Sequence, residues 1–311
     1  MPNKPTKQWF LPAPWGKIAL VSWGHPANPA VLMCHGFMDS AATFIPLLEL
    51  LPDSYYYVAF DFPGHGLSDP YPAGMLPSLT HLLGVTRRVV DHMTWERFNF
   101  LSHSMGGLVG AFYNAIYPNT INKIINLDIS TALGSFLTAS TTGAAELSSW
   151  YLYLYDEYYG NYKRYNTPDP RLVTYEEAVS SVARNRKVTK EQAAILLSRS
   201  LIPAGDGKFH YSWDPKMKKI TNITLSRETL THIFTRHTPP TLNVTSSELK
   251  PEDPFTQFSV DMMRVIQETA ANHETVFVKG GHDLHVTNAR EVAPYVVEFL
   301  DRPFNACLSK L

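Results

Sequence analysis

The sequence predicts an α/β protein built on a mostly parallel, doubly wound sheet with a helical segment inserted into it. Short apolar runs rich in β-branched and aromatic residues alternate along the chain with longer stretches of helical pattern. The middle runs are apolar throughout, as expected of parallel strands that are covered on both faces. Such alternation is typical of doubly wound sheets with right-handed crossovers.

The apolar runs and the stretches between them give the expected elements in chain order. Strands are expected at Ile18–Trp23, Ala30–Cys34, Tyr55–Phe60, Phe98–Ser102, Ile124–Asp128, Thr241–Thr245 and Thr275–Val278. Helices are expected at Ala41–Leu51, Leu79–Met93, Met105–Tyr117, Thr256–Ala271 and Val286–Leu300. The segments Gln8–Pro14 and Gly16–Trp23 follow each other too closely for a crossover helix, so we expect an antiparallel hairpin at one edge of the sheet.

The alternation of strands and helices stops between Thr131 and Thr238. This stretch has a helical pattern and no convincing parallel strand. We therefore predict a helical cap, residues 131–238, inserted into a core made of residues 1–130 and 239–311. Aromatic residues crowd positions 150–165 of the cap. Their rings with polar tips can either pack the cap onto the core or line a substrate tunnel, and both interpretations stay open.

Composition excludes several classes of protein. The 311 residues include 27 Lys and Arg against 28 Asp and Glu, a formal net charge of −1, which gives no electrostatic reason to bind nucleic acid or anionic membranes. Cys34 and Cys307 cannot build a disulfide framework or a cysteine-rich metal site. No apolar stretch is long enough for a membrane span, and the N-terminal residues lack the apolar region of a secretory signal. We expect an intracellular protein without a metal or another cofactor.

The final tripeptide, Ser309-Lys310-Leu311, has the form of a peroxisomal address. It predicts the peroxisomal import receptor as a partner and the peroxisome as the location. If the tripeptide is a chance occurrence on a frayed tail, the expected location is the cytoplasm.

The strongest functional signal is the segment Ser102-His103-Ser104-Met105-Gly106-Gly107, between a predicted strand and a predicted helix. A strand–turn–helix of this kind can form a nucleophile elbow, in which small residues on both sides of the central Ser let the turn close. Ser102 stands where Gly is usual, and it is still small. Ser104 is the candidate nucleophile, and the N–H of Met105 at the helix N-terminus is a candidate oxyanion donor. The alternative is that Ser104 is a helix N-cap.

The loop after the strand Ala30–Cys34 supplies a second candidate oxyanion donor. The N–H of Phe37 is the natural choice, because the preceding Gly36 permits a backbone conformation that other residues resist. His35 in this loop, and His65 in the tight turn after the next strand, are interpreted as packed, hydrogen-bonded loop residues rather than bases.

A Ser nucleophile is weak unless a neighbouring His takes its proton. His282 follows the last predicted strand in the segment Gly280-Gly281-His282-Asp283, so its loop returns to the sheet edge that carries the elbow. The order Ser, acid, His along the chain agrees with this fold. We assign His282 as the general base, with His285 as the lesser candidate.

Two carboxylates compete for the acid that orients this histidine. The usual position, the end of the strand after the cap, has no Asp, and Glu248 is the nearest carboxylate there. Asp128 ends a strand that neighbours the nucleophile strand, so it can reach the same histidine. The alternatives are a turn cap for Asp128 and a solvated loop charge for Glu248. We favour Asp128.

At these motifs the sequence resembles the α/β-hydrolase superfamily, and within it the serine hydrolase-like (kraken-type) proteins. The matching segments are Pro14–Ala19, His35–Ser40, Tyr56–Phe62, Gly64–Ser68, Ser102–Gly107 and Gly281-His282. The resemblance covers the core at both ends, and the cap only vaguely.

The resemblance implies an α/β-hydrolase fold with Ser104 as nucleophile, His282 as base, and Phe37 and Met105 as oxyanion donors. The Leu127-Asp128-Ile129 stretch looks like that of superfamily esterases whose acid follows the strand after the nucleophile helix. The departures from the common pattern are Ser102 in place of Gly and the missing Asp after the cap.

The leading hypothesis is a serine hydrolase of the carboxylesterase or thioesterase type. It would cleave a small-molecule ester or thioester with an apolar moiety through an acyl-enzyme on Ser104. A peroxisomal address would favour acyl-CoA or another lipid-derived ester. Epoxide hydrolases and haloalkane dehalogenases need an Asp nucleophile, which Ser104 replaces. The alternatives are an acyltransferase that uses the same residues and a non-catalytic ligand-binding protein on the same scaffold.

Overall fold

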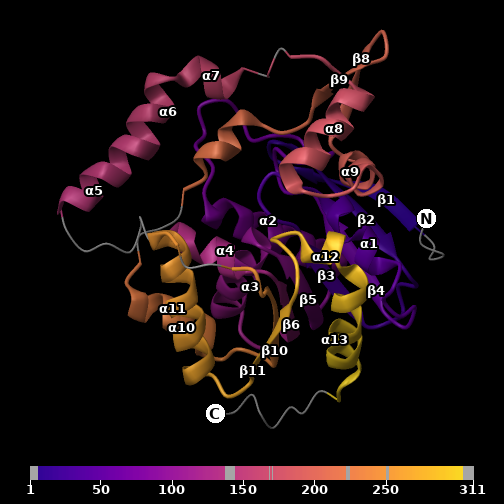
Figure 1. Cartoon of the computed structure of the whole chain (residues 1–311), viewed down its shortest axis with the longest axis vertical. Coiled ribbons are helices and arrows are strands. Elements are labelled where there is room, and N and C mark those ends of the chain that lie inside the picture. The colour runs from indigo at the N-terminus through magenta and orange to yellow at the C-terminus, as the bar shows by residue number, and fades with distance from the viewer. Residues whose placement is uncertain are drawn as a thin grey trace.

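An eight-stranded sheet forms the centre of the computed structural model, which describes residues 6–136, 144–167, 169, 171–221, 225–249 and 252–303 (Figure 1). Its strand order is β1-β2-β4-β3-β5-β6-β10-β11. The strands are β1 Thr6–Ala13, β2 Gly16–Trp23, β3 Ala30–Cys34, β4 Tyr56–Phe60, β5 Phe98–His103, β6 Ile121–Leu127, β10 Thr241–Ser246 and β11 His273–Val278.

Neighbouring strands run parallel from β4 to β11. At the other edge, β1 and β2 form an antiparallel hairpin, and β2 pairs antiparallel with β4. The predicted mostly parallel sheet with an edge hairpin is therefore confirmed. Parallel pairing brings the carboxyl ends of β3, β5, β6 and β10 to one edge, and the predicted site residues stand at or just after these ends.

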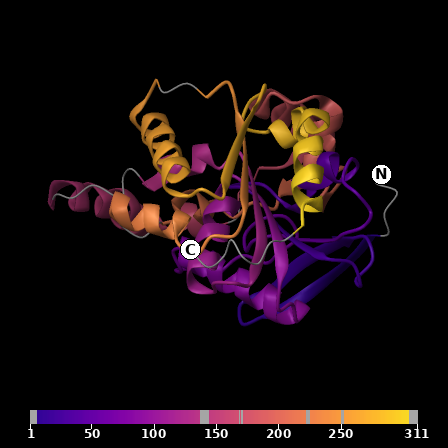
Figure 2. The same ribbon diagram turned by 90° about the horizontal axis from the view of Figure 1, so that it is seen from below.

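Helices cover both faces of the sheet. They are the 3₁₀ helix η1 Ala41–Phe44 and the α-helices α1 Ile45–Leu48, α2 Leu79–Met93, α3 Met105–Ile116, α11 Pro254–Thr269, α12 Leu284–Thr287 and α13 Ala289–Asp301. Within β3, Leu32 packs in one buried cluster with residues of α2, α3 and α11, and Val31 packs in a second with residues of α1, α12 and α13. Figure 2 shows α11 and α13 on opposite sides of the strands. Since both faces are covered, these strands are apolar throughout.

Two expected helices are divided in the structure. The stretch Ala41–Leu51 becomes η1 followed by the short α1, where Pro46 stands in the first turn. Proline has no backbone N–H, so it fits the start of a new helical segment but not the interior of a continuous one. The last expected helix is split at Asn288, which ends α12 and precedes α13.

The segment between β6 and β10 holds all the remaining elements of the described residues. They are α4 Ser130–Leu133, η2 Gly134–Phe136, α5 Ala144–Tyr151, the π-helical η3 Leu152–Asp156, α6 Glu157–Gly160, α7 Tyr162–Asn166, β7 Val173–Thr174, α8 Tyr175–Arg186, α9 Lys190–Leu197, β8 Leu201–Gly205, β9 Lys208–Tyr211, η4 Pro215–Lys219 and α10 Arg227–Thr235. Most of these are helical, as expected. The three strands form a small antiparallel sheet that the sequence pattern does not predict, because each strand is five residues or shorter.

Parts of this segment attach to the core in different ways. Helix α10 contributes Leu230 and Phe234 to the buried cluster beneath α3 and α11, whereas α8 and α9 form a separate small cluster that includes Val286 of α12. The helices α5 to α7 extend away from the central sheet (Figures 1 and 2). In the aromatic run, Tyr158 and Tyr165 are buried.

Helix α3 lies unusually close to β3, and Gly106 makes this possible. A Cβ at position 106 would collide with the carbonyl oxygens of Cys34 and His35, which are backbone atoms and cannot rotate away. Gly84 in α2 is a matched contrast, because nothing lies within 4 Å of a Cβ built there.

We predict opposite effects for the two alanine substitutions. Gly106→Ala should lower the free energy of unfolding by about 2 kcal/mol or more, since the backbone of β3 must shift. Gly84→Ala should raise it by up to about 1 kcal/mol, since Ala favours the helix. Urea unfolding followed by circular dichroism measures both. A Gly106→Ala protein as stable as the wild type would contradict the close packing of α3 on β3.

Candidate active site

Ser104 stands on a strained turn between β5 and α3. Its backbone adopts φ 51° and ψ −119°, a region that non-glycine residues rarely occupy. The turn is held by hydrogen bonds from the Ser104 N–H to the carbonyl of Leu127 (3.1 Å) and from the Gly107 N–H to the Ser104 carbonyl (2.9 Å). The Ser104 side chain makes no capping hydrogen bond to α3, so its hydroxyl is not consumed as an N-cap.

Ser102, which replaces the usual Gly of this motif, has its own polar partner. Its Oγ donates to Oδ1 of Asn126 at 2.9 Å, and Asn126 Nδ2 donates to Oδ1 of Asn243 at 2.9 Å. These three buried residues link β5, β6 and β10. The hydroxyl of Ser102 is therefore satisfied inside the sheet and costs the turn little.

Asp128 and His282 are joined by a short hydrogen bond, in which His282 Nδ1 lies 2.6 Å from Asp128 Oδ2. Asp128 follows β6 in a positive-φ turn and is 1% exposed, whereas His282, in the loop between β11 and α12, is 37% exposed. The other carboxylate oxygen of Asp128 accepts from Ser130 Oγ (2.9 Å) and from the Ser246 N–H (3.2 Å). The Nδ1 side of the imidazole is thereby fixed, while the side chain as a whole remains partly exposed.

These contacts set the charge of Asp128. Burial raises the pKa of its carboxyl, but the hydrogen bonds from His282, Ser246 and Ser130 outweigh burial and hold the pKa below its ordinary value. Asp128 is therefore an anion at neutral pH. Near the start of helix α4, Asp128 accepts from the side-chain hydroxyls of Ser130 and Thr131, whereas the N-cap position of α4 is Ile129, so these bonds do not make Asp128 a backbone cap.

Glu248 and His285 do not take the positions considered for them as alternatives. Glu248 is exposed, and its backbone N–H bonds to Ser246 Oγ at 3.1 Å. The nitrogen of His282 that a carboxylate would orient is already bonded to Asp128. His285 is fully buried, with Nε2 at 2.7 Å from Thr43 Oγ1.

The loop after β3 passes directly beside the elbow. A Cβ at Gly36 would lie 2.8 Å from His103 Nδ1 and 3.2 Å from Ser104 Cβ, so only glycine lets the loop approach this closely. The backbone N–H groups of the two residues after Gly36 differ in their hydrogen bonding. The N–H of Met38 is bonded to His65 Nε2 at 3.2 Å. In the part of the chain that the structure describes, the N–H groups of Phe37 and Met105 make no hydrogen bond to another residue.

His35 and His65 act as loop supports, as predicted. His35 Nε2 accepts from the N–H of Phe62 at 3.0 Å, and its Nδ1 donates to the Gly36 carbonyl at 2.7 Å. Both histidines are fully buried, and burial lowers the pKa of each, that of His65 to about 3. They are neutral at physiological pH and fix the backbone on either side of the Phe37 peptide.

A large cavity opens at this edge of the sheet. Its volume is about 1410 Å³, and it is bounded by the loop after β3, by the His282 loop and by α8, α9 and η4 of the inserted segment. Its apolar lining comes from Phe37, Met38, Val173, Val182, Leu196, Leu197, Tyr211, Trp213 and Pro215. The aromatic run at residues 150–165 is not among the residues that line it, so the tunnel interpretation is not supported for this cavity.

Arg186, the last residue of α8, ties the inserted segment to both loops of the site. Its guanidinium bonds to Asp39 Oδ2 at 3.0 Å and to Asp283 Oδ2 at 2.8 Å. Asp39 lies two residues after Phe37, and Asp283 follows His282. This bridge could not be predicted from the sequence, because nothing in the local pattern of α8 distinguishes Arg186 from the other basic residues near its end.

Two further expectations concern the C-terminal tripeptide and the lack of a membrane span. Ser309-Lys310-Leu311 lies outside the described residues, so the peroxisomal address stays a prediction. Within the described ranges, no helix has the length and apolar character to cross a membrane.

The chain is similar to known proteins in both sequence and structure. A model of the alpha/beta hydrolase fold matches residues 29–289. The serine hydrolase-like protein of Danio rerio is 27% identical over 302 residues, covering 96% of this chain and 89% of that protein. The probable serine hydrolase of Drosophila melanogaster is 27% identical over 303 residues, covering 94% and 87%. The thioesterase domain from the curacin biosynthetic pathway superposes with a TM-score of 0.73 at 22% identity, covering 94% of this chain and 99% of that domain.

We predict that Arg186→Met destabilises the protein by about 3 kcal/mol at pH 7, because it leaves two buried carboxylates without their cation. Burial raises the pKa of Asp39, but Arg186 outweighs burial and holds that pKa well below its ordinary value. The contribution of Asp39 to stability is therefore fully present above about pH 4 and is lost as the pH falls below it.

Arg184→Met is the matched control, since Arg184 is exposed on the same helix. It should change stability by less than about 0.5 kcal/mol. Urea unfolding at pH 7 and near pH 3 measures the free energy of unfolding of each variant. The loss of stability in Arg186→Met relative to the wild type should be smaller at the lower pH. A deficit that is equal for both variants, or independent of pH, would rule out the bridge as the cause.

Proposed function

The chain belongs to the alpha/beta hydrolase fold family, and we propose that it is a serine hydrolase whose nucleophile is Ser104. One observation carries this proposal: the Asp128–His282 hydrogen bond of 2.6 Å lies at the strand ends beside the turn that presents Ser104. An anionic acid, a histidine and a hydroxyl that does not cap its helix are the components of an activated serine.

In the proposed mechanism, Ser104 Oγ attacks the carbonyl carbon of the substrate while His282 Nε2 takes its proton. Asp128 keeps the Nδ1–H of His282 oriented and stabilises the imidazolium that forms. The N–H groups of Phe37 and Met105 donate to the oxyanion of the tetrahedral intermediate. His282 returns the proton to the leaving group, and an acyl-enzyme remains on Ser104. Water, deprotonated by His282, then attacks the acyl carbon and releases the acid and the free serine.

We further propose an ester or thioester with an apolar moiety as the substrate. The cavity is larger than most small-molecule sites, and apolar side chains from the inserted segment contribute to its wall. Its charged lining residues are balanced in sign: Arg171, Arg184, Arg186, Lys187 and Lys218 stand against Asp39, Asp169, Glu177, Glu248 and Asp283. This balance favours an uncharged reacting portion over a polyanion. Similarity to a thioesterase domain is compatible with either leaving atom.

The inserted segment has a defined part in this proposal. We propose that residues 131–238 act as the cap that closes the cavity over the reacting groups and excludes water from them. Helices α8 and α9 and the 3₁₀ helix η4 supply its contribution to the cavity wall.

The nucleophile is tested with a fluorophosphonate probe, which labels activated serines. We expect the wild type to be labelled and Ser104→Ala to lose all label. Ser102→Ala is the matched control from the same segment, because the Ser102 hydroxyl is buried and bonded to Asn126. It should keep its label. An unlabelled wild type would favour the non-catalytic binding protein.

The acid is tested by paired carboxylate-to-amide substitutions. Asp128→Asn should lower kcat by about 10⁴-fold on p-nitrophenyl esters of graded acyl length, since the amide favours the wrong imidazole tautomer. Glu248→Gln should leave kcat within about twofold. If Asp128→Asn stays near wild-type activity while Glu248→Gln loses it, the acid is Glu248. Esters and acyl-CoA thioesters assayed side by side then separate the two substrate classes.

A further inference from the structure

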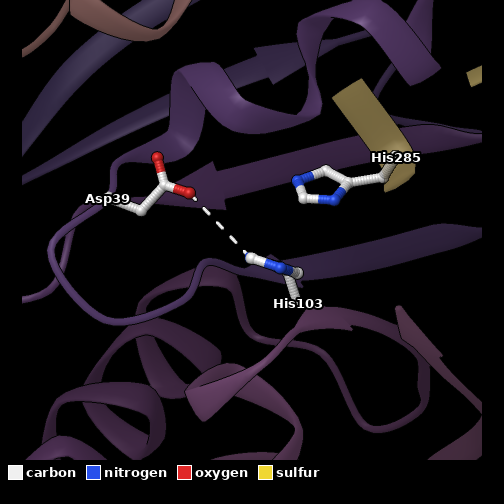
Figure 3. A group of neighbouring side chains, drawn as sticks. All are labelled: Asp39, His103 and His285. Atoms are coloured by element: carbon white, nitrogen blue, oxygen red, sulfur yellow. Dashed lines mark ion pairs between the residues drawn. The ribbon is translucent and has the colours of Figure 1, made fainter. Parts of the chain in front are cut away.

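We propose that Asp39, His103 and His285 form a binding site for a divalent transition-metal cation of the Zn²⁺ class. The three side chains come from separate parts of the core: the loop after β3, the end of β5 and helix α12. Figure 3 shows them gathered at the carboxyl edge of the sheet. None of them is a member of the proposed triad, so this site is additional to the proposed activity.

The donor atoms are close enough for one ion. Each residue offers one ligand atom, and these atoms all lie within 4.8 Å of one another. Asp39 Oδ2 is 3.9 Å from His103 Nδ1, and the rings of His103 and His285 have centroids 4.1 Å apart. Ligand atoms of a tetrahedral zinc site lie about 3.3 Å apart, so the donors would close in by roughly 1 Å. Imidazole and carboxylate ligands suit Zn²⁺ and its neighbours in the transition series.

The two histidines each present a nitrogen that nothing else uses. His103 Nδ1 and His285 Nδ1 are buried and have no hydrogen-bond partner among the described residues. Their other nitrogens are engaged, His103 Nε2 with the His282 carbonyl at 3.1 Å and His285 Nε2 with Thr43 Oγ1 at 2.7 Å. A carbonyl only accepts, so His103 carries its proton on Nε2 and has a lone pair on Nδ1. Thr43 Oγ1 can accept from His285 in the same way. Outer hydrogen bonds of this kind orient metal-binding histidines.

The protonation states also suit a cation. Burial lowers the pKa of both His103 and His285, that of His285 to about 3, so both rings are neutral at physiological pH. Neutral imidazole is the form that binds metal. Burial raises the pKa of Asp39, but Arg186 outweighs it and keeps the carboxylate ionised. The two imidazoles and the carboxylate are buried together, with little exposure.

The cavity gives an ion access to the site, and the neighbouring charged residues determine what its binding would change. Asp39 and His103 line the large cavity, so an ion can reach them from there. Arg186 shares Asp39 Oδ2 with the proposed ion and also bonds to Asp283. Counting Asp39, Asp283 and Arg186, the surroundings carry one excess negative charge. An ion on Asp39 would compete with Arg186 for the same oxygen, and so would weaken the link between α8 and the loop that carries Phe37.

The test measures Zn²⁺ binding directly, with the full chain and calorimetry. We expect one equivalent to bind the wild type. His285→Gln, which removes one proposed ligand away from the triad, should weaken binding tenfold or more. His232→Gln on the exposed surface of α10 is the matched control and should bind as the wild type does. His282→Gln should also keep its equivalent, which separates this site from a metal bound at the proposed base.

Zn²⁺ binding is measured without turnover, so this experiment gives its result even if the protein has no hydrolase activity. Should His285→Gln fold poorly, an anomalous difference map from a Zn²⁺-soaked crystal of the wild type decides the matter. A peak between Asp39, His103 and His285 supports the site. The proposal is overturned by no bound equivalent, by binding that His285→Gln leaves unchanged, by loss of binding in His282→Gln, or by a peak elsewhere only.

Discussion

The hydrogen bond between Asp128 and His282 is the contact on which the arrangement of the site depends. It joins the end of β6 to the loop after β11, across the intervening β10, and Ser246 of β10 donates to the same carboxylate. The bond helps to fix this loop against three parallel strands, together with the Arg186–Asp283 contact and the hydrogen bond from His103 Nε2 to the His282 carbonyl. The position of the imidazole relative to the Ser104 turn therefore follows from strand order.

Much of the core was predictable, because its signals are local. Continuous apolar runs predict buried parallel strands, and the small residues around Ser104 predict a sharp turn before a helix. The contacts that use distant residues could not be predicted. Nothing in the sequence near Arg186 indicates that it meets Asp39 and Asp283, because that contact depends on how α8 packs onto the core. The three short strands of the inserted segment were missed for a related reason, since two to five residues are too few to establish a period of two.

The residues of the candidate site also fall into those that the local sequence predicts and those that it does not. Ser104, His282, Phe37 and Met105 belong to motifs that can be recognised from neighbouring residues alone. The sequence alone could not decide between Asp128 and Glu248, because both follow strands that end at the same edge. The structure places Asp128 against His282, while Glu248 is exposed. The sequence also could not predict that His103 and His285 are buried. A sequence motif does not show whether the second nitrogen of a histidine has a hydrogen-bond partner.

The strained backbone at Ser104 has a consequence for how this protein can change over generations. A residue held at φ 51° costs of order 1 kcal/mol or more, which glycine would not incur. Replacement of Ser104 by glycine is thus a mutation that would improve folding while it removes the hydroxyl. In a lineage that no longer needs the hydroxyl, stability alone would drive this position toward glycine. A serine that persists here across divergent descendants would accordingly be a record of selection for chemistry and not for the fold.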